Sequence, residues 1–328
     1  MDSFGRKIDY LRISVTDRCN ERCLYCMPEG YKGWESKPDH LTAGEIIRVV
    51  RVAAGLGFRK FRLTGGEPLV RGDVPDIVRA MTAIHGVETI ALSTNGMKLA
   101  ALAQPLRDAG LRTVNVSLDA MDPEIYHRIT GGDVARVLAG IRAAVAAGFE
   151  RVKLNCVLMR SVNEAEIWPL VLFAAEHGLP LRLIELMPLT TTDVLTEKNF
   201  LPCGEVMRLL AQKDELVPQP DLRLGHGPAQ YYLLKQTGAL VGLNIVGLRR
   251  RGATRAEMHR LRGAYRSLFF VEGRLTDRIE AVAREFADDP MVGKIVAFIR
   301  AGGKRPLMRP RDKRHVEASV GAAADDAG

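Results

Sequence analysis

The chain has 328 residues, of which 47% are hydrophobic, and this length is enough to bury one large core or two smaller ones without help from a partner. It contains no run of about 18 apolar residues and no signal-peptide core, so we expect no membrane segment and a cytoplasmic location. Much of the net charge of +8 lies in residues 249–251 and 304–314, and aromatic side chains rarely interleave with the basic ones. We therefore expect a solvated basic surface and no nucleic-acid partner. A pocket for a polyanion such as a nucleoside triphosphate stays open as the sharper alternative.

Short runs rich in Val, Ile and Leu alternate along the chain with longer amphipathic patterns. The runs predict strands at residues 11–15, 60–63, 89–93, 113–117, 152–157 and 181–185. The amphipathic patterns predict helices at residues 42–56, 73–84, 99–109, 134–147 and 164–177. Thr42 with Glu45 forms a capping-box pattern, and several of the helices end at a glycine such as Gly110.

The repeated strand–helix order predicts an α/β fold with a parallel sheet, because parallel neighbours need a crossover helix. Six such units favour a partial (βα)6 barrel of the TIM type, whose active site lies at the carboxyl ends of the strands. After residue 200 the pattern changes to a hairpin, with strands at 231–235 and 239–246, followed by helices at 275–286 and 291–301. We therefore expect a core barrel at residues 1–200, a substrate-side extension at 201–303 and a disordered basic tail at 304–328.

Three of the five cysteines, Cys19, Cys23 and Cys26, form a CxxxCxxC motif directly after the first predicted strand. The odd total and the tight spacing favour a metal site in a reducing compartment over disulfides. Three thiolates suit an iron–sulfur cubane whose fourth iron stays open, whereas a structural zinc site needs four ligands, usually as two separated pairs. Because Cys156 and Cys203 are isolated, we favour a catalytic cluster over zinc.

CxxxCxxC with an aromatic residue before the last cysteine resembles the signature of the radical S-adenosylmethionine (SAM) superfamily. The segment from Phe4 to Gly30 is similar to the N-terminus of the MoaA family, the GTP 3',8-cyclases of molybdenum cofactor biosynthesis. Five further segments match that family in order: RLTGGEPLVRGD from Arg62, STNG from Ser93, NVSLDA from Asn115, VKLNCV from Val152 and IELMP from Ile184. The resemblance implies the radical SAM barrel and a lyase that turns GTP into 3',8-cyclo-7,8-dihydro-GTP.

The resemblance also implies two cofactors: one [4Fe-4S] cluster held by the three cysteines of the motif, and SAM bound to its open iron. One electron from the cluster then cleaves SAM to a 5'-deoxyadenosyl radical, which takes a hydrogen from the substrate. Transfer of the family pattern assigns SAM contacts to Tyr25, Gly65, Gly66, Glu67, Ser117, Asn155 and Met187. On the residues alone, the glycines permit close approach of a ligand, but a plain turn and a strand-end hydroxyl at Ser117 are also compatible with the sequence.

The same transfer assigns substrate contacts to Arg12, Arg62, Ser93, Lys153 and Arg182, with Arg12 also counted among the catalytic residues. Unpaired charges pointing into a barrel are costly, so the cations predicted on strands need an anion. Substrate phosphate is the favoured partner, and salt bridges to Glu67, Asp119 or Glu185 are the alternative. The resemblance further implies an electron donor such as flavodoxin or ferredoxin, and the sequence leaves a homodimer open.

The pattern departs from the family after residue 200. MoaA proteins carry a second cysteine triad whose cluster contacts guanine, but this chain has no cysteine after Cys203, and it ends in Asp-Ala-Gly where the family has Gly-Gly. Residues 258–262 resemble the family's C-N-R-L-R segment, which makes Arg260 and Arg262 candidate substrate contacts and puts Met258 in the place of a ligand. The alternative function is therefore a MoaA-derived enzyme that acts on another nucleotide or phosphorylated metabolite with one cluster. A cluster-bearing scaffold without catalysis is the third hypothesis.

Overall fold

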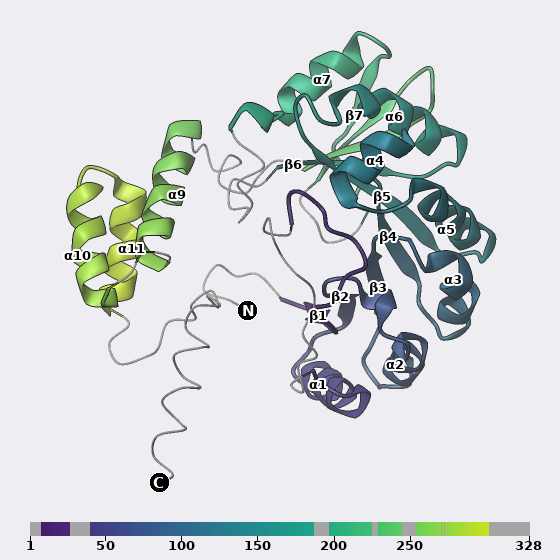
Figure 1. The fold of residues 1–328 in the computed structure, drawn as a ribbon. Coiled ribbons are helices and arrows are strands. Elements are labelled where there is room, and N and C mark those ends of the chain that lie inside the picture. The colour runs from purple at the N-terminus through teal and green to yellow at the C-terminus, as the bar shows by residue number, and fades with distance from the viewer. Residues whose placement is uncertain are drawn as a thin grey trace. The chain divides into compact units, whose positions relative to one another are not determined.

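The computed structural model describes residues 8–26, 40–186, 197–224, 229–244, 254–269, 271 and 273–301. The chain divides into two compact units, Met1–Val246 and Gly247–Gly328, and each is described here by itself. The first unit holds a sheet covered by helices, and the second is a small helical bundle (Figure 1). Six consecutive strand–helix units build most of the first unit, which confirms the α/β class and the partial barrel that the sequence predicts.

One sheet of nine strands runs through the described part of the first unit, in the order β1-β2-β3-β4-β5-β6-β9-β8-β7. Its first six strands are β1 (Tyr10–Ser14), β2 (Lys60–Thr64), β3 (Thr89–Thr94), β4 (Thr113–Ser117), β5 (Arg151–Leu158) and β6 (Leu181–Glu185). Each of these pairs in parallel with the next. Their carboxyl ends therefore meet at one edge of the sheet, and the CxxxCxxC motif follows β1 at that edge.

Helices connect the parallel strands, and α1, α2, α3 and α5 follow one another along one side of the sheet (Figure 1). The helices of this unit are α1 (Ala43–Gly55), α2 (Val74–Thr82), α3 (Leu99–Asp108), α4 (Pro123–Thr130), α5 (Val134–Ala146), α6 (Ile167–Glu176) and α7 (Cys203–Ala211). Three short 3-10 turns accompany them: η1 (Pro68–Val70), η2 (Glu164–Glu166) and η3 (Glu197–Asn199). The capping box predicted at the start of α1 is present, since the Thr42 amide donates to Glu45 Oε2 at 2.8 Å and the Glu45 amide to Thr42 Oγ1 at 3.3 Å. The sequence did not predict α4 and α7.

The parallel sheet has one apolar and one polar face, because side chains alternate along each strand. The apolar face packs against the helices through buried residues that include Phe61, Leu63, Leu92, Val114, Val116, Leu154 and Leu183. The other face lines the inside of the partial barrel and carries Arg62, Ser93, Asn115, Ser117, Lys153, Asn155 and Arg182. Apolar side chains fill the interior of most small barrels, so a wall of cations and amides marks this surface as a place for a polar ligand.

Three further strands extend the sheet beyond β6: β7 (Leu216–Gln219), β8 (Gln230–Leu234) and β9 (Leu240–Asn244). The predicted hairpin is confirmed as β8 and β9, and Gly238 turns between them in the left-handed region with a φ of 70°. β9 pairs in parallel with β6, while β7 adds an antiparallel strand that the sequence did not predict. The expected extension at residues 201–303 is therefore spread over both units, and its place on the substrate side stays a prediction.

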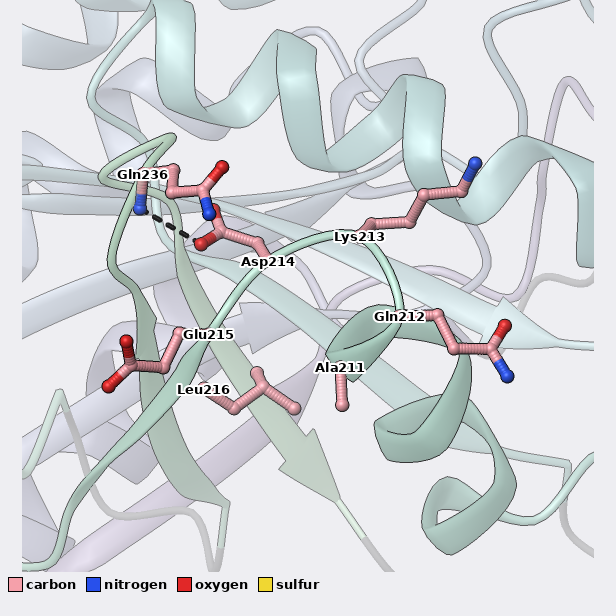
Figure 2. A pocket seen from close by; sticks show the side chains of 7 residues that line it. All are labelled: Ala211, Gln212, Lys213, Asp214, Glu215, Leu216 and Gln236. Atoms are coloured by element: carbon pink, nitrogen blue, oxygen red, sulfur yellow. Dashed lines mark hydrogen bonds between the residues drawn. The ribbon is translucent and has the colours of Figure 1, made fainter.

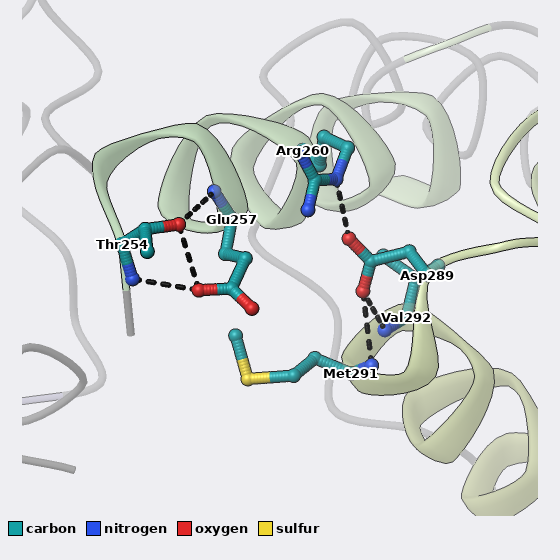
Figure 3. Close-up of polar contacts among 6 residues, drawn as sticks. All are labelled: Thr254, Glu257, Arg260, Asp289, Met291 and Val292. Carbon is teal, nitrogen blue, oxygen red and sulfur yellow. Dashed lines mark hydrogen bonds and ion pairs between the residues drawn. The ribbon is translucent and has the colours of Figure 1, made fainter. Parts of the chain in front are cut away.

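The second unit consists, in its described part, of α9 (Arg255–Phe269), α10 (Leu275–Glu285) and α11 (Pro290–Ala301). Its small core is formed by Ala264, Leu268, Ile279, Val282, Val292 and Val296. Asp289 ties the bundle together, since its carboxylate accepts hydrogen bonds from the amides of Met291 (2.9 Å) and Val292 (3.1 Å) and pairs with Arg260 Nε at 2.6 Å (Figure 3). The basic stretches at 249–251 and 304–314 lie outside the described residues. None of the described helices combines the length and the hydrophobicity that a bilayer span requires.

Candidate active site

The loop after β1, residues 15–26, carries the three cysteines of the motif and is named here the cluster loop. Cys19 and Cys23 are partly buried and Cys26 is exposed. Arg22 closes the loop on itself, because its Nη1 donates to the carbonyls of Cys19 (3.0 Å) and Glu21 (2.8 Å). The loop is thus held in a defined turn with its thiols at the carboxyl edge of the sheet.

The C-terminal end of helix α4 is hydrogen-bonded to the cluster loop. The amides of Arg22 and Leu24 donate to the carbonyls of Thr130 (2.7 Å) and Ile129 (2.9 Å), carbonyls that have no partner within the helix at such an end. The buried Glu21 carboxylate accepts a bond from the Tyr126 hydroxyl at 2.9 Å, and its other oxygen lies 4.0 Å from Cys23 Sγ. Burial raises the pKa of Glu21 to about 7. A helix that the sequence did not predict therefore supports the central residues of the motif.

Glu67 joins the ends of two strands beneath the cluster loop. Its carboxylate, 1% exposed, accepts hydrogen bonds from Thr94 Oγ1 (2.7 Å) and from the amides of Asn95 (2.6 Å) and Leu69 (2.9 Å). Asn95 in turn donates to Asn20 Oδ1 at 2.9 Å and lies 4.0 Å from Cys19 Sγ. Because both oxygens of Glu67 are engaged by the protein, we interpret this residue as a support for the loop rather than a direct SAM contact.

The two glycines of the GGEP segment bring the end of β2 against the backbone of the cluster loop. A Cβ on Gly65 would lie 2.2 Å from the Thr16 carbonyl oxygen, and a Cβ on Gly66 would lie 2.3 Å from that of Arg18. The amides of Gly66 and Glu67 donate to these same two carbonyls at 2.8 and 2.7 Å. The two glycines therefore allow the end of β2 to pack closely against the backbone of the cluster loop. Gly66 is also exposed to solvent.

Asp119, two residues beyond β4, holds the aromatic residue of the motif. Its carboxylate accepts a hydrogen bond from the Tyr25 hydroxyl at 2.6 Å and another from the Val157 amide at 2.8 Å. The Asn163 side chain donates to the Asp119 carbonyl at 2.9 Å. Burial raises the pKa of Asp119 to about 6 and the pKa of Tyr25 well above its usual range. The orientation of Tyr25 is thereby fixed by strands β4 and β5.

The three thiols lie where their ionisation is unfavourable without a metal. Burial raises the pKa of Cys19 to about 11 and that of Cys23 well above its usual range, with the carboxylates of Glu67, Glu21 and Asp119 adding to the effect. Within the described residues no three His, Cys, Asp or Glu side chains converge on a point as a single metal ion requires. An iron–sulfur cubane places its protein thiolates on different irons and supplies the positive charge that thiolates need, so the residues present fit a cluster better than a zinc ion.

The polar face inside the partial barrel extends to the carboxyl ends of β4 and β5. Ser117 on β4 is the register partner of Asn155 on β5, and Asn155 Oδ1 accepts a hydrogen bond from Arg182 Nε at 2.9 Å. Arg62 Nε donates to the Tyr10 hydroxyl at 2.6 Å, and its Nη1 reaches Ser93 Oγ at 3.3 Å. Arg12 is the register partner of Arg62 and is exposed. The structure thus places four of the residues that the sequence assigns to the substrate on this face: Arg12, Arg62, Ser93 and Arg182.

Lys153 is the most deeply buried of these cations, with 2% of its surface exposed. Its ammonium group donates to the carbonyl of Leu224, in the loop between β7 and β8. Burial lowers the pKa of Lys153 to about 7, and the neighbouring Arg182, Arg151 and Arg62 lower it further. Burial likewise lowers the pKa of Arg182. These cations repel one another, and no carboxylate among the described residues forms an ion pair with them.

The salt bridges considered as an alternative are not formed in the described part of the chain. The Glu67 and Asp119 carboxylates are engaged as above, and Glu185 Oε1 accepts a bond from the Cys203 amide at 2.9 Å. No described carboxylate lies within ion-pair distance of Arg62, Lys153 or Arg182.

For three predicted site residues the structure gives no position relative to this face of the sheet. Met187 lies outside the described residues, as does the side chain of Arg262 on α9. Arg260 belongs to the second unit and pairs with Asp289 there (Figure 3). These three assignments stay predictions.

One described pocket, of about 430 Å³, lies at the opposite edge of the sheet, where α7 turns into β7 (Figure 2). Its lining residues are Ala211, Gln212, Lys213, Asp214, Glu215, Leu216 and Gln236. Asp214 accepts hydrogen bonds from the amides of Gln236 and Thr237, both at 2.9 Å, and so ties this turn to the β8–β9 hairpin. Because the buried carboxylate of Asp214 is hydrogen-bonded to backbone amides, we interpret this pocket as a structural feature separate from the candidate active site.

Comparison with protein families places these features in a class. The family described as the Radical SAM superfamily matches residues 13–174, which include the end of β1, the cluster loop and β2 to β5. SuiB of Streptococcus suis, solved with S-adenosylmethionine, shares the fold with a TM-score of 0.53 and 18% identity, over 62% of this chain and 46% of that one. The match to this family gives the chain a radical SAM domain, so the protein is a radical SAM enzyme and its cofactors are a [4Fe-4S] cluster and SAM.

Relatives of known name define the family. The GTP 3',8-cyclase of Pelotomaculum thermopropionicum is 45% identical over 247 residues, 74% of each chain. That of Moorella thermoacetica is 46% identical over 234 residues, 71% of this chain and 72% of that one. GTP 3',8-cyclase 1 of Pseudomonas aeruginosa is 44% identical over 235 residues, 71% of this chain and 70% of that one. The chain belongs to the GTP 3',8-cyclase family.

A different family matches the C-terminal region. Residues 230–308, from β8 through α11, match the family described as UDP N-acetylglucosamine O-acyltransferase, domain 2. This stretch includes residues 258–262, which the sequence analysis compares with a cyclase segment. The similarity to that cyclase segment therefore has a competing explanation, and the roles of Arg260 and Arg262 gain no support from it.

Sequence reasoning missed four residues that the structure gives a part in the site: Glu21, Asn95, Asn115 and Asp119. Each lies inside or directly after a segment that matches the family, but none is a residue type that such chemistry demands. What singles them out is burial combined with polar partners, and the strand register creates both. For Glu21, Asn95 and Asp119 the signal available in the sequence was their position at or after the carboxyl ends of strands, whereas Asn115 lies in the middle of β4.

Proposed function

We propose that the protein converts GTP into 3',8-cyclo-7,8-dihydro-GTP, the first step of molybdenum cofactor biosynthesis. The observation that carries this proposal is the set of cations inside the barrel that form no ion pair with a described carboxylate, in a member of the GTP 3',8-cyclase family. A nucleoside triphosphate supplies the negative charge that this face lacks. A small neutral substrate would leave it uncompensated.

Cys19, Cys23 and Cys26 would hold the cluster, and the support for this is their position on a loop braced by α4 and by Glu67. When bound, the cluster supplies the electron that cleaves SAM to a 5'-deoxyadenosyl radical. The protein's own part is to hold the loop in place through these contacts. Glu21 and Asn95 lie near the thiols and restrict the positions that a cluster can take.

SAM would lie across the carboxyl ends of β2, β4 and β5. Gly65 and Gly66 bring the backbone to the edge of the cluster loop, and Ser117 with Asn155 offers polar groups on the neighbouring strands. Tyr25, anchored by Asp119, would present its backbone and ring to the cofactor from the opposite side. Glu67 would act through the position of the loop, and Met187 remains an assignment from the family pattern.

The triphosphate would be bound by Arg62, Lys153 and Arg182, with Arg12 and Ser93 at the margin. Guanidinium groups suit phosphate oxygens because they donate in a planar fork, and a buried ammonium adds a compact charge. The chain has no cysteine after Cys203, so recognition of guanine would rest on hydrogen bonds rather than on a second cluster. This is where the protein would differ from the family pattern.

We further propose that a small electron carrier such as flavodoxin or ferredoxin reduces the cluster, and that the protein works in the cytoplasm. The reducing environment of that compartment preserves thiols, which the three clustered cysteines need in order to bind an iron–sulfur cluster. Size-exclusion chromatography with light scattering separates the monomer from the homodimer that the sequence leaves open.

The test is an anaerobic incubation of the reconstituted full-length protein with SAM, dithionite and GTP. The expected products are 5'-deoxyadenosine and cyclised GTP in matching amounts, and the Cys26→Ala variant should form neither above background. A panel of ATP, CTP, UTP and nucleotide sugars runs in parallel. Formation of 5'-deoxyadenosine without cyclised GTP, or stimulation by another member of the panel, would contradict the proposal and favour a different phosphorylated substrate.

A further inference from the structure

We propose that Asn115 is a positioning residue that holds the guanidinium groups of Arg62 and Arg182 side by side, so that both bind one oligophosphate chain. The inference rests on the proposed function, because it concerns the same anion site. It adds a residue that sits at the centre of that site and carries no charge of its own.

The contacts of Asn115 place it between the two arginines. With its amide oxygen turned toward them, Oδ1 accepts from Arg62 Nη1 at 2.9 Å and from Arg182 Nη2 at 3.3 Å. Two nitrogens that share one acceptor lie within about 6 Å of each other. Asn115 itself is 4% exposed, so water offers little competition for these bonds. Two like charges on strands β2 and β6 are thereby gathered at one point on β4.

Each arginine is also fixed at its other end. Arg62 Nε donates to the Tyr10 hydroxyl at 2.6 Å, and Arg182 Nε donates to Asn155 Oδ1 at 2.9 Å. All of these acceptors are neutral oxygens. The site therefore orients two guanidinium groups without cancelling their charge, and preorganised cations of this kind lose little conformational freedom when an anion binds.

The neighbours of Asn115 in the sheet complete the picture. Its register partners are Ser93 on β3 and Lys153 on β5. A buried Asn usually satisfies its hydrogen bonds with backbone or neutral side chains. Here the Asn115 oxygen faces two cations and lies beside a third. Gathering three cations around one buried residue costs free energy unless a ligand brings negative charge. This is why we assign the residue to ligand binding rather than to the sheet alone.

The test compares two substitutions at this position in the full-length holoenzyme. Asn115→Asp keeps an acceptor for both arginines but places a negative charge where the ligand's charge belongs, and Asn115→Leu removes the acceptor without adding charge. Gln230→Glu, at an exposed position on β8, adds the same charge elsewhere in the first unit. Binding of GTP and of inorganic triphosphate is measured by calorimetry, and kcat and KM by the formation of 5'-deoxyadenosine.

We expect Asn115→Asp to weaken binding of both ligands by at least about tenfold, because the added carboxylate competes for the same cations. Asn115→Leu should raise KM for GTP by about threefold or more, since the arginines lose their shared acceptor. In both variants kcat at saturating GTP and SAM binding should stay within about twofold of wild type, and Gln230→Glu should change nothing beyond that range. Loss of affinity with retained kcat separates a role in positioning from a role in folding.

Two results would overturn the inference alone. One is wild-type affinity for triphosphate in Asn115→Asp, and the other is a parallel loss of SAM binding and triphosphate binding in both variants, which indicates a structural role. If the wild-type holoenzyme binds neither GTP nor inorganic triphosphate, the proposed substrate fails together with the inference. Binding of GTP by wild type with no response to Asn115 leaves the proposed function standing without it.

Discussion

Lys153 offers the sharpest quantitative prediction, because its charge depends on pH in the range where the enzyme is assayed. The pKa of this buried ammonium is lowered from 10.5 to about 7 by burial and by the arginines around it. At pH 8 about nine-tenths of the unliganded protein therefore carries a neutral Lys153. A bound triphosphate restores the charge by attracting the proton. We expect GTP binding at pH 8 to take up about 0.9 proton, and at pH 6 about 0.1 proton, through this residue.

The assay is isothermal calorimetry of the holoenzyme with GTP in two buffers of different ionisation enthalpy, where the slope of the observed heat gives the protons exchanged. The variant Lys153→Met should show almost no uptake at pH 8 and weaker binding, because the cation is absent at every pH. Uptake in Lys153→Met equal to that of wild type, or no uptake by wild type at pH 8, would refute the argument.

The same shift has a consequence for stability whose sign is fixed. The folded-state pKa of a base is lowered here, so the unfolded chain binds more protons than the native one between about pH 7 and pH 10.5. The contribution of Lys153 to the free energy of unfolding of the unliganded protein should therefore increase as the pH rises through this window. Denaturation by urea at pH 7 and pH 9 measures it, with Lys153→Met as the control that lacks the trend.

Three further predictions concern support of the site and of the second unit. Gly66→Ala would bring a Cβ within 2.3 Å of a carbonyl oxygen in the cluster loop, and we expect a loss of about 1–3 kcal/mol in stability and poor iron incorporation. The control variant Gly72→Ala, whose Cβ would have no atom within 4 Å, should match wild type in thermal melts and in iron content. Tyr126→Phe removes the hydroxyl bonded at 2.9 Å to the buried carboxylate of the cluster loop, so a chelator should extract iron faster than from wild type; equal rates would show that this bond does not support the loop. Asp289→Ala removes the acceptor for two amides at the start of α11 and should cost the helical bundle about 0.5–2 kcal/mol, measured by circular dichroism, with the exposed Asp288→Ala as a neutral control.

The parallel strands and their crossover helices were predictable because hydrophobic periodicity reports burial directly. The six predicted strands match β1 to β6 within one residue at each end. Helix α4 was missed although Asp122 and Pro123 begin it and Gly131 ends it, because its eight residues are too few to show a clear period. Local signals at the two ends would have located it.

The candidate site was predictable as far as residue chemistry dictates it. Cysteines at cluster spacing and cations on strands indicate a functional site, because few structural roles require them. The residues that support the site could not be predicted in this way. Asn95 contacts a residue 75 positions away, Glu21 one 105 positions away and Asp119 one 38 positions away. Such contacts exist only once the strands are in register. The family similarity of the C-terminal unit could not be predicted from its residues, since a short basic helix can resemble more than one family.

One isotope experiment tests whether this radical SAM enzyme acts on the ribose of GTP, as we propose. A bond between C3' and C8 cannot form unless the hydrogen at C3' is removed, and the radical from SAM is the group that takes it. GTP deuterated at C3' is incubated with the reduced holoenzyme and SAM, and the 5'-deoxyadenosine is analysed by mass spectrometry. We predict that it carries one deuterium and that none appears with the Cys26→Ala variant. Abundant 5'-deoxyadenosine without deuterium would contradict the account.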